Sequence, residues 1–418
     1  MAVYYNTVSK IPKDKSKKYK CVTIHILEDH LEDFQRTLSI ATTPRRQKKG
    51  DLLKNSPYGL LNLPDYENQE TPIELNPVYQ FFFATDEDRE DVNTKLKISI
   101  LKTTRSLWFP ERPEHPNKGL MYICDEIVTP VYPVYILSKG RWKTRHTAKT
   151  LEEMKVPYKI VVEPQEYHNY KEVISDEKIL ILPDEYMNKN QGSIPARNFV
   201  WRHSIDNGHA CHWVLDDNIE GFFRWNHNKR LPLKSGICFK QIEDYMNLHD
   251  NVAQCGIQYA SMFPEISMAR PVILTNTRIY SCILIKNNVD IEERWRGKFN
   301  EDTDLSIRLM KKGYSTILFQ NYLCGKKTTL SVKGGNSQIY SGDGLKLKYE
   351  SLKEQHPDIV SCVSRFSKEI HHQVDYTCFK NNSIVLRGNV IFLPSYPEIK
   401  LVPCNDITPE DEEEQEES

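Results

Sequence analysis

The hydrophobic positions between residues 131 and 182 fall into three short runs, at 131–137, 158–162 and 178–182, each rich in β-branched side chains. A polar segment through Leu151 and Met154 separates the first two runs and has helical character. Short apolar runs bounded by polar segments predict buried strands, and strands that alternate with helices predict an α/β domain. We therefore expect a Rossmann-like, mostly parallel sheet flanked by helices.

The first part of the chain lacks this regular alternation. Strands are expected at residues 19–27 and 78–83 and helices at 31–40 and 86–98, which predicts an α+β accessory region. Near the end, residues 383–392 favour a hairpin, and an acidic tail follows it. The expected division is an accessory region of unknown role at 1–127, a catalytic domain at 128–375 and a C-terminal segment at 376–418.

An acidic cluster follows the apolar strand at residues 213–215. It consists of Asp216, Asp217 and Asn218. Open α/β sheets bind ligands at the carboxyl ends of their strands, and hard ions such as Mg²⁺ or Mn²⁺ take oxygen ligands from carboxylates and substrate phosphates. The three residues are therefore candidate ligands of a metal-bound nucleotide diphosphate. An acidic turn after a buried strand is the alternative.

A second acidic cluster, Glu301 and Asp302, precedes a segment in which Leu305 and Leu309 have the spacing of a buried helix face. A carboxylate at such a position can act as a general base that accepts the proton of a substrate hydroxyl. Asp302 is the first candidate for this base and Glu301 the second. The alternative is a helix cap with favourable charge, made by Asp302 or Thr303.

Further polar residues are candidates for contacts with a nucleotide. The first strand-to-helix loop, a helix that runs into the strand at 213–215, and a Gly/Ser/Lys loop at 326–344 each offer donors to phosphates. Ordinary loop geometry and an exposed helix arginine are the alternatives. The candidates are Ser138, Lys139, Arg141, Arg197 and Lys333, together with Asp216.

Aromatic residues alternate with cations at 221–230, a mixture suited to an extruded nucleotide or a glycan. Arg224 and Trp225 are its candidate acceptor or DNA contacts, and Arg270 lies in a loop expected to face the acceptor. The alternative is an aromatic hairpin that packs on its neighbour.

The overall composition narrows the class of protein. The chain has 418 residues, with 56 Lys and Arg against 57 Asp and Glu, so the whole molecule has no net attraction to nucleic acid. Its ten cysteines form no Cys-x-x-Cys pair, which indicates neither a zinc site nor a disulfide framework. No apolar run approaches the roughly 18 residues of a membrane span. We therefore expect a cytoplasmic protein, in the host cytoplasm if the source is viral.

Five motifs in order resemble the TET-associated glycosyltransferases, GT-A-type enzymes of bacteriophages and related genomes. The resemblance implies transfer of a sugar from a nucleotide donor to the hydroxymethyl group of a modified pyrimidine in DNA. It places Asp216 at the nucleoside and Asp217 or Asn218 at the metal, although the amide of Asn218 departs from the usual carboxylate. The motifs are Val134-Tyr-Ile-Leu-Ser-Lys-Gly-Arg141, Pro157-Tyr-Lys-Ile-Val-Val-Glu-Pro-Gln-Glu-Tyr167, Ile194-Pro-Ala-Arg-Asn198, Trp213-Val-Leu-Asp-Asp-Asn218 and Phe299-Asn-Glu-Asp-Thr-Asp304.

The leading hypothesis is an inverting, metal-dependent glycosyltransferase that uses a nucleotide sugar, UDP-glucose first, with Mn²⁺ or Mg²⁺. Its expected acceptor is 5-hydroxymethylcytosine or 5-hydroxymethyluracil in DNA. A protein, glycan or small-molecule acceptor is the first alternative. A non-enzymatic DNA-binding protein on a degenerate transferase fold is the second.

Overall fold

The structure is a computed structural model of the chain. Contacts divide its described residues into two units, with the boundary between Lys118 and Gly119. No helix among the described residues combines the length and the apolar composition needed to cross a membrane. The described residues are 3–5, 21–39, 45–46, 77–83, 85–104, 106–111, 117–187, 191–226, 229–263, 271–327, 344–365, 369–388 and 396–404.

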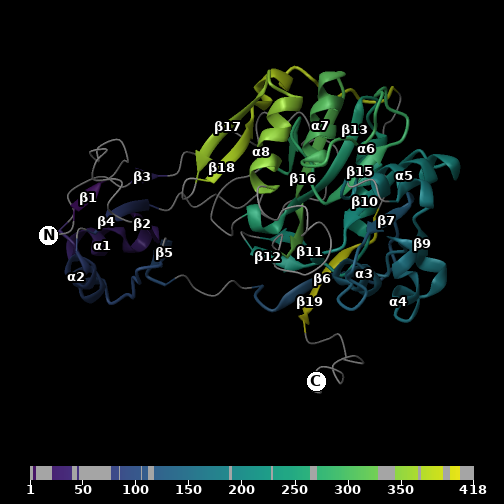
Figure 1. The fold of residues 1–418 in the computed structure, drawn as a ribbon. Coiled ribbons are helices and arrows are strands. Elements are labelled where there is room, and N and C mark those ends of the chain that lie inside the picture. Colours follow the sequence, from purple (N-terminus) through teal and green to yellow (C-terminus); the bar gives the residue numbers. More distant parts are fainter. Residues whose placement is uncertain are drawn as a thin grey trace. The chain divides into compact units, whose positions relative to one another are not determined.

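The unit before Gly119 is a small α+β fold (Figure 1). Its sheet has the order β1-β4-β2-β5, with β3 beside β4. The rings of Phe34 and Tyr79 stack in its core at 5.7 Å, and Thr85 and Asp88 form a capping box at the start of α2. The elements are β1 (Val3–Tyr5), β2 (Cys21–Ile26), α1 (Leu31–Thr37), β3 (Arg45–Arg46), β4 (Pro77–Phe82), α2 (Asp86–Leu96) and β5 (Ser106–Phe109).

The larger unit contains a sheet of ten strands in the order β12-β11-β16-β13-β15-β10-β7-β8-β9, with β14 beside β16. Four of its described pairings are parallel and five are antiparallel, so the α/β class is confirmed but the sheet is mixed rather than mostly parallel. The strands are β7 (Val134–Leu137), β8 (Lys159–Val162), β9 (Ile179–Ile181), β10 (Cys211–Asp216), β11 (Ile219–Asn226), β12 (Lys229–Pro232), β13 (Val252–Tyr259), β14 (Ile273–Thr275), β15 (Cys282–Lys286) and β16 (Ser315–Lys326).

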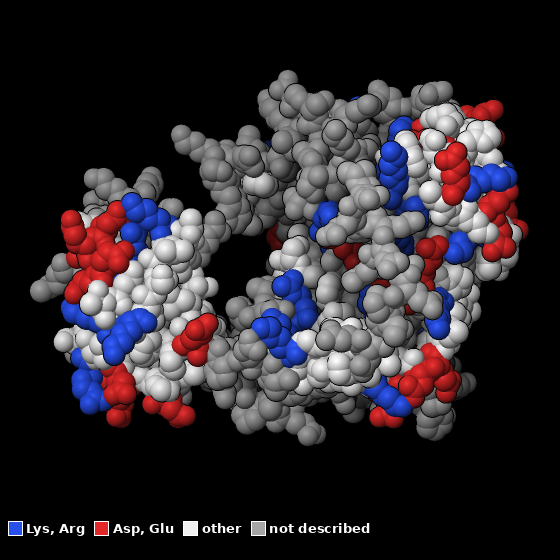
Figure 2. All heavy atoms as spheres, turned by 90° about the horizontal axis from the view of Figure 1, so that it is seen from below, with Lys and Arg blue, Asp and Glu red and all other residues white. Residues whose placement is uncertain are grey.

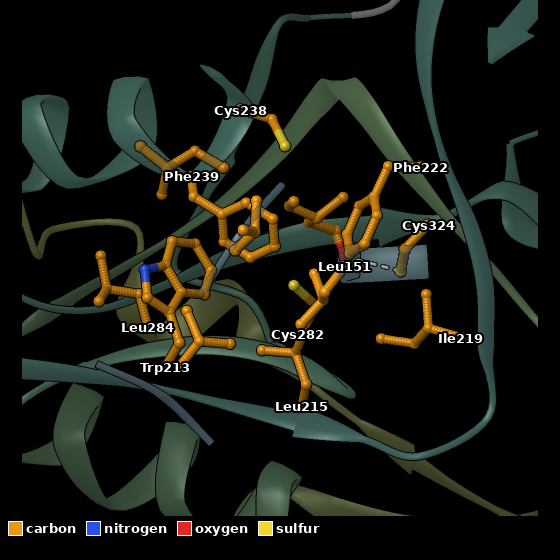
Figure 3. Packing of buried hydrophobic residues seen from close by; sticks show 14 of the residues in the cluster. Leu151, Trp213, Leu215, Ile219, Phe222, Cys238, Phe239, Cys282, Leu284 and Cys324 are labelled. Atoms are coloured by element: carbon orange, nitrogen blue, oxygen red, sulfur yellow. Dashed lines mark hydrogen bonds between the residues drawn. The ribbon is translucent and has the colours of Figure 1, made fainter. Parts of the chain in front are cut away.

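Both faces of this sheet are buried, as the apolar run of β10 illustrates. Trp213 and Leu215 pack in one hydrophobic cluster and Val214 in another. In the first cluster the ring of Phe239 is met edge to face by Trp213 at 4.9 Å and by Phe222 at 5.3 Å (Figure 3). Helices supply the facing side chains, from α3 (His146–Glu153), α4 (Tyr167–Lys171), α5 (Ile194–Asp206), α6 (Ile237–Asn247) and α7 (Glu301–Lys311).

Two further strand pairs complete this unit. β6 (Leu120–Cys124) pairs antiparallel with β19 (Ile399–Pro403), and β17 (Val360–Arg365) pairs with β18 (Glu369–Val374), which α8 (Gly344–Gln355) contacts. The expected hairpin at 383–392 lies partly outside the described residues, and its described part holds one isolated bridge, between His249 and Leu386. The acidic tail at 409–418 lies outside them. Short 3₁₀ turns lie at Glu28–His30, Pro164–Glu166, Asp176–Lys178, Asp184–Tyr186, Ala260–Met262 and Tyr376–Phe379.

Candidate active site

Asp216 ends β10 and carries two cations on its carboxylate. Arg197 Nη2 lies 3.1 Å from Oδ1, and Lys326 Nζ lies 2.6 Å from Oδ2, to which Ser281 also donates. Burial raises the pKa of Asp216, but Lys326 and Arg197 outweigh it and hold the pKa well below its usual range. Asp216 is therefore an anion at neutral pH that fixes a lysine and an arginine beside it.

Asp217 contacts the loop that follows β7. The hydroxyl of Ser138 donates to Oδ2 at 2.9 Å, and Arg141 Nη1 pairs with Oδ1. The Tyr170 hydroxyl lies 2.6 Å from the same serine oxygen and accepts from the Arg141 amide at 3.2 Å. Burial raises the pKa of Asp217, which Arg141 opposes. The structure thus brings Ser138, Arg141 and Asp217 together, because β7 and β10 are paired in parallel.

The third position of the cluster, Asn218, is 5 % exposed, and its amide nitrogen donates to the Lys327 carbonyl at 3.2 Å. Both carboxylates before it are already paired with cations. Among the described residues no group of three or more His, Cys, Asp or Glu side chains could hold a metal. This donor set does not fit an ion held by Asp216, Asp217 and Asn218 as they are arranged, and the dependence on Mn²⁺ or Mg²⁺ stays a prediction.

Arg197 connects the two acidic clusters. Its side chain is 4 % exposed, and while Nη2 binds Asp216, Nε lies 3.3 Å from Glu301 Oε1. Its guanidinium lies 4.6 Å from the centre of the Trp295 ring. The alternative of an exposed helix arginine is therefore wrong. Ser193 occupies the N-cap position of α5, but its hydroxyl makes no cap hydrogen bond and instead donates to Glu301 Oε1 at 2.9 Å.

Asp302 lies in the first turn of α7 but does not cap it. The cap position is Asn300, and Asp302 Oδ1 accepts from the Thr303 amide at 2.7 Å, whereas Oδ2 has no hydrogen bond among the described residues. Burial, together with the charge of Glu301, raises the pKa of Asp302 to about 7, which Arg197 opposes. A carboxyl with this pKa and a free oxygen can accept a proton near neutral pH.

Three tyrosines lie around Asp302. Tyr259 and Tyr280 stack with ring centres 5.6 Å apart. Burial raises the pKa of Tyr280 and that of Tyr376, the latter to about 12, and the charge of Asp302 adds to both shifts. Arg278 lies 5.0 Å from the centre of the Tyr280 ring. Three aromatic rings and the guanidinium of Arg278 thus lie near Asp302.

The remaining predicted residues have partners other than these carboxylates or lie outside the described residues. Lys139 is exposed and pairs with Glu163 at 2.7 Å. Trp225 is 3 % exposed and packs edge to face on Phe263 at 4.6 Å, which corresponds to the alternative of a packed aromatic hairpin. Arg224 is also buried, over the Tyr122 ring at 5.2 Å. Lys333 and Arg270 lie outside the described residues.

Sequence reasoning missed Lys326, Ser281 and the tyrosines. Lys326 was expected in a loop because the apolar run that predicts its strand stops at residue 319, whereas β16 continues to Lys326 through buried Gln320 and Asn321. The local signal in the sequence is the apolar pair Leu323 and Cys324, which indicates that the strand continues toward Lys326.

Comparison with protein families matches residues 132–335 to the family described as TET-Associated Glycosyltransferase. The matched segment includes Asp216, Arg197, Asp302 and Lys326. No curated protein matches the chain.

Proposed function

We propose a reaction for this protein on the premise that residues 132–335 belong to the TET-associated glycosyltransferase family, which makes the protein a glycosyltransferase. The proposed donor is a nucleotide sugar, with UDP-glucose as the first candidate. The proposed acceptor is the hydroxymethyl group of 5-hydroxymethylcytosine or 5-hydroxymethyluracil in DNA, and the proposed fold of the matched segment is GT-A-like. The observation that supports a transfer site is Arg197, which joins the carboxylates of Asp216 and Glu301.

In the proposed reaction, Asp302 in its carboxylate form accepts the proton of the acceptor hydroxyl through Oδ2. The hydroxyl oxygen forms a bond to the anomeric carbon while the bond from that carbon to the diphosphate oxygen breaks, and the diphosphate leaves with the electron pair. A single displacement of this kind inverts the configuration at the anomeric carbon. The loop that contains Ser138 and Arg141 is proposed to hold the nucleotide.

The tyrosines around Asp302 support a pyrimidine acceptor, because aromatic side chains can stack on an extruded base. On the face shown in Figure 2, the described lysines and arginines and the described aspartates and glutamates form small separate groups. The proposed recognition depends on the base.

The test is transfer to DNA that contains either modified base, with a panel of UDP and GDP sugars and with Mn²⁺ or chelator, followed by mass analysis of the digested nucleosides. The expected result is one added hexose per modified nucleoside. Asp302→Asn should lower the rate by about 100-fold or more, as expected for loss of a general base. Asp358→Asn is the control, because that carboxylate is exposed and pairs with Lys311 at 2.8 Å.

Other results would redirect the proposal. Transfer to saccharides or proteins but not to DNA would support the alternative acceptors. DNA binding without transfer from any donor would support the non-enzymatic alternative.

A further inference from the structure

We propose that Lys326 and Arg197 supply the positive charge that receives the leaving diphosphate, so that transfer proceeds without a divalent ion. This inference rests on the proposed function, because it concerns the nucleotide donor of the same site. It departs from the sequence-based expectation of Mn²⁺ or Mg²⁺.

Lys326 lies at the carboxyl end of β16, beside the end of β10 in the site. Its Nζ is 2.6 Å from Asp216 Oδ2 and 2.8 Å from Ser281 Oγ, and it lies 5.6 Å from the centre of the Tyr259 ring. An ammonium group has three donors, and these two contacts use two of them. The third donor remains for a ligand, and the side chain is 19 % exposed, so solvent and substrate reach it.

Arg197 provides an independent observation. Its Nε and Nη2 contact Ser193 and Asp216, but the buried Nη1 has no hydrogen-bond partner among the described residues. Buried guanidinium nitrogens are rarely left unpaired, since the cost of desolvation is not recovered. A phosphate oxygen is an acceptor whose charge and geometry match a guanidinium.

The two cations share one anchor. Asp216 binds Lys326 through one carboxylate oxygen and Arg197 through the other, so both oxygens that a metal would use are occupied. An ion placed on Asp216 would lie next to two positive groups, and like charges repel strongly in a partly buried site. Asp216 therefore orients two cations toward the donor instead of acting as a metal ligand.

The first test compares metal-stripped wild type with Lys326→Met and Lys327→Met, with either EDTA or Mn²⁺ in the assay. Lys327 is the matched control, because it is the next residue but pairs with Glu220 at 3.2 Å. The expected result is that wild type keeps at least half of its activity in EDTA. Lys326→Met should lose about 100-fold in kcat, which Mn²⁺ does not restore, as expected when a preorganised charge is removed. Lys326→Arg should recover part of the loss.

The second test measures UDP binding by calorimetry in EDTA, independently of turnover. Wild type and Lys327→Met should bind UDP alike, and Lys326→Met should bind at least about tenfold more weakly at an unchanged melting temperature. The inference is overturned if UDP binding or transfer requires Mn²⁺, or if Lys326→Met and Lys327→Met behave alike. Absence of transfer from every donor, with or without Mn²⁺, would instead overturn the proposed function, while the UDP titration would still decide the role of Lys326.

Discussion

Asp302 has its unusual acidity because three charged neighbours and burial act on one carboxyl. Burial and the charges of Glu301 and Asp216 raise its pKa to about 7, and Arg197 limits the rise. If Asp302 is the base, the transfer rate should increase with pH and reach half its plateau near pH 7, since only the carboxylate accepts a proton. Steady-state kcat/KM between pH 5 and 9 measures this rise. A rate that does not depend on pH over that range would contradict the assignment.

A neutral replacement at Glu301 separates its influence from that of burial. Glu301→Gln removes the like charge beside Asp302 while it keeps the size of the side chain. The pKa of Asp302 should therefore fall, and the midpoint of the rise in kcat/KM should move to lower pH. The same kcat/KM profile measures the shift. A midpoint that stays in place or rises would show that Glu301 does not act on Asp302 through its charge.

The residues that the sequence predicts best are those whose role is encoded locally. Asp216 and Asp302 stand at the ends of a clear apolar strand and a clear helix, so their places can be inferred. The ion pair between Lys326 and Asp216 depends on how far β16 extends and on which strands pair. The local sequence pattern specifies neither of these. For a similar reason, local pattern does not indicate that the hydroxyl of Ser193, at the N-cap of α5, donates to Glu301, which lies 108 residues away in the chain.

At the scale of elements, α7 is fixed by a buried carboxylate that is not part of the proposed chemistry. Asp304 is fully buried and binds Arg308 at 2.7 Å, Arg296 at 3.0 Å and His356 at 2.9 Å. Burial raises the pKa of Asp304, but His356, Arg296 and Arg308 together hold it below its usual value. This cluster positions the helix whose first turn carries Asp302.

Asp304→Asn should lower the free energy of unfolding by about 3 kcal/mol, because it leaves the partly buried guanidinium groups of Arg296 and Arg308 without their counter-charge. Asp290→Asn is the control, since that side chain is 84 % exposed and lies 3.4 Å from Lys312. The control should change stability by less than about 1 kcal/mol. Urea unfolding of both variants measures the difference, and equal effects would show that the Asp304 cluster contributes little.

Helix α6 carries a second buried carboxyl. Glu243 accepts from the amides of Val131 and Tyr132, at 2.7 and 3.1 Å, and from the Trp213 indole at 2.9 Å. Burial outweighs these hydrogen bonds and raises the pKa of Glu243 from 4.5 to about 7. Glu243 therefore connects α6 to the segment before β7 and to β10.

Because the pKa of Glu243 is raised in the folded state, its contribution is greatest below pH 4.5 and is lost as the pH rises through about 7. Relative to Glu243→Gln, wild type should lose about 3 kcal/mol of unfolding free energy over this interval. Urea unfolding of both proteins at several pH values gives this difference. Parallel curves would show that Glu243 does not titrate in this range.

The strand directions could not be predicted at this scale. The runs at 131–137, 158–162 and 178–182 do form the parallel strands β7, β8 and β9. The apolar run at β15 looks the same in sequence, yet it lies antiparallel between β10 and β13. A strand buried on both faces is apolar whichever way it runs, so its direction depends on the connections on either side.

At the scale of the whole molecule, two strands that lie far apart in the sequence of the larger unit pair with each other. β19 pairs with β6, in which Met121 and Tyr122 are 2 % and 1 % exposed. A chain that stops after Gly388 should therefore melt at least about 5 °C below a chain that stops after Cys404, which corresponds to a loss of roughly 2 kcal/mol. Differential scanning calorimetry measures the difference, and equal melting temperatures would show that β19 is dispensable.

In this pairing, β6 is synthesised long before its partner strand. Lys400 of β19 meets Asp125, next to β6, across 275 residues of chain. While the ribosome makes the intervening strands and helices, β6 lacks the strand that pairs with it in the finished protein. We expect the emerging chain to depend on chaperones during this interval and to gain resistance to proteases only after β19 has left the exit tunnel.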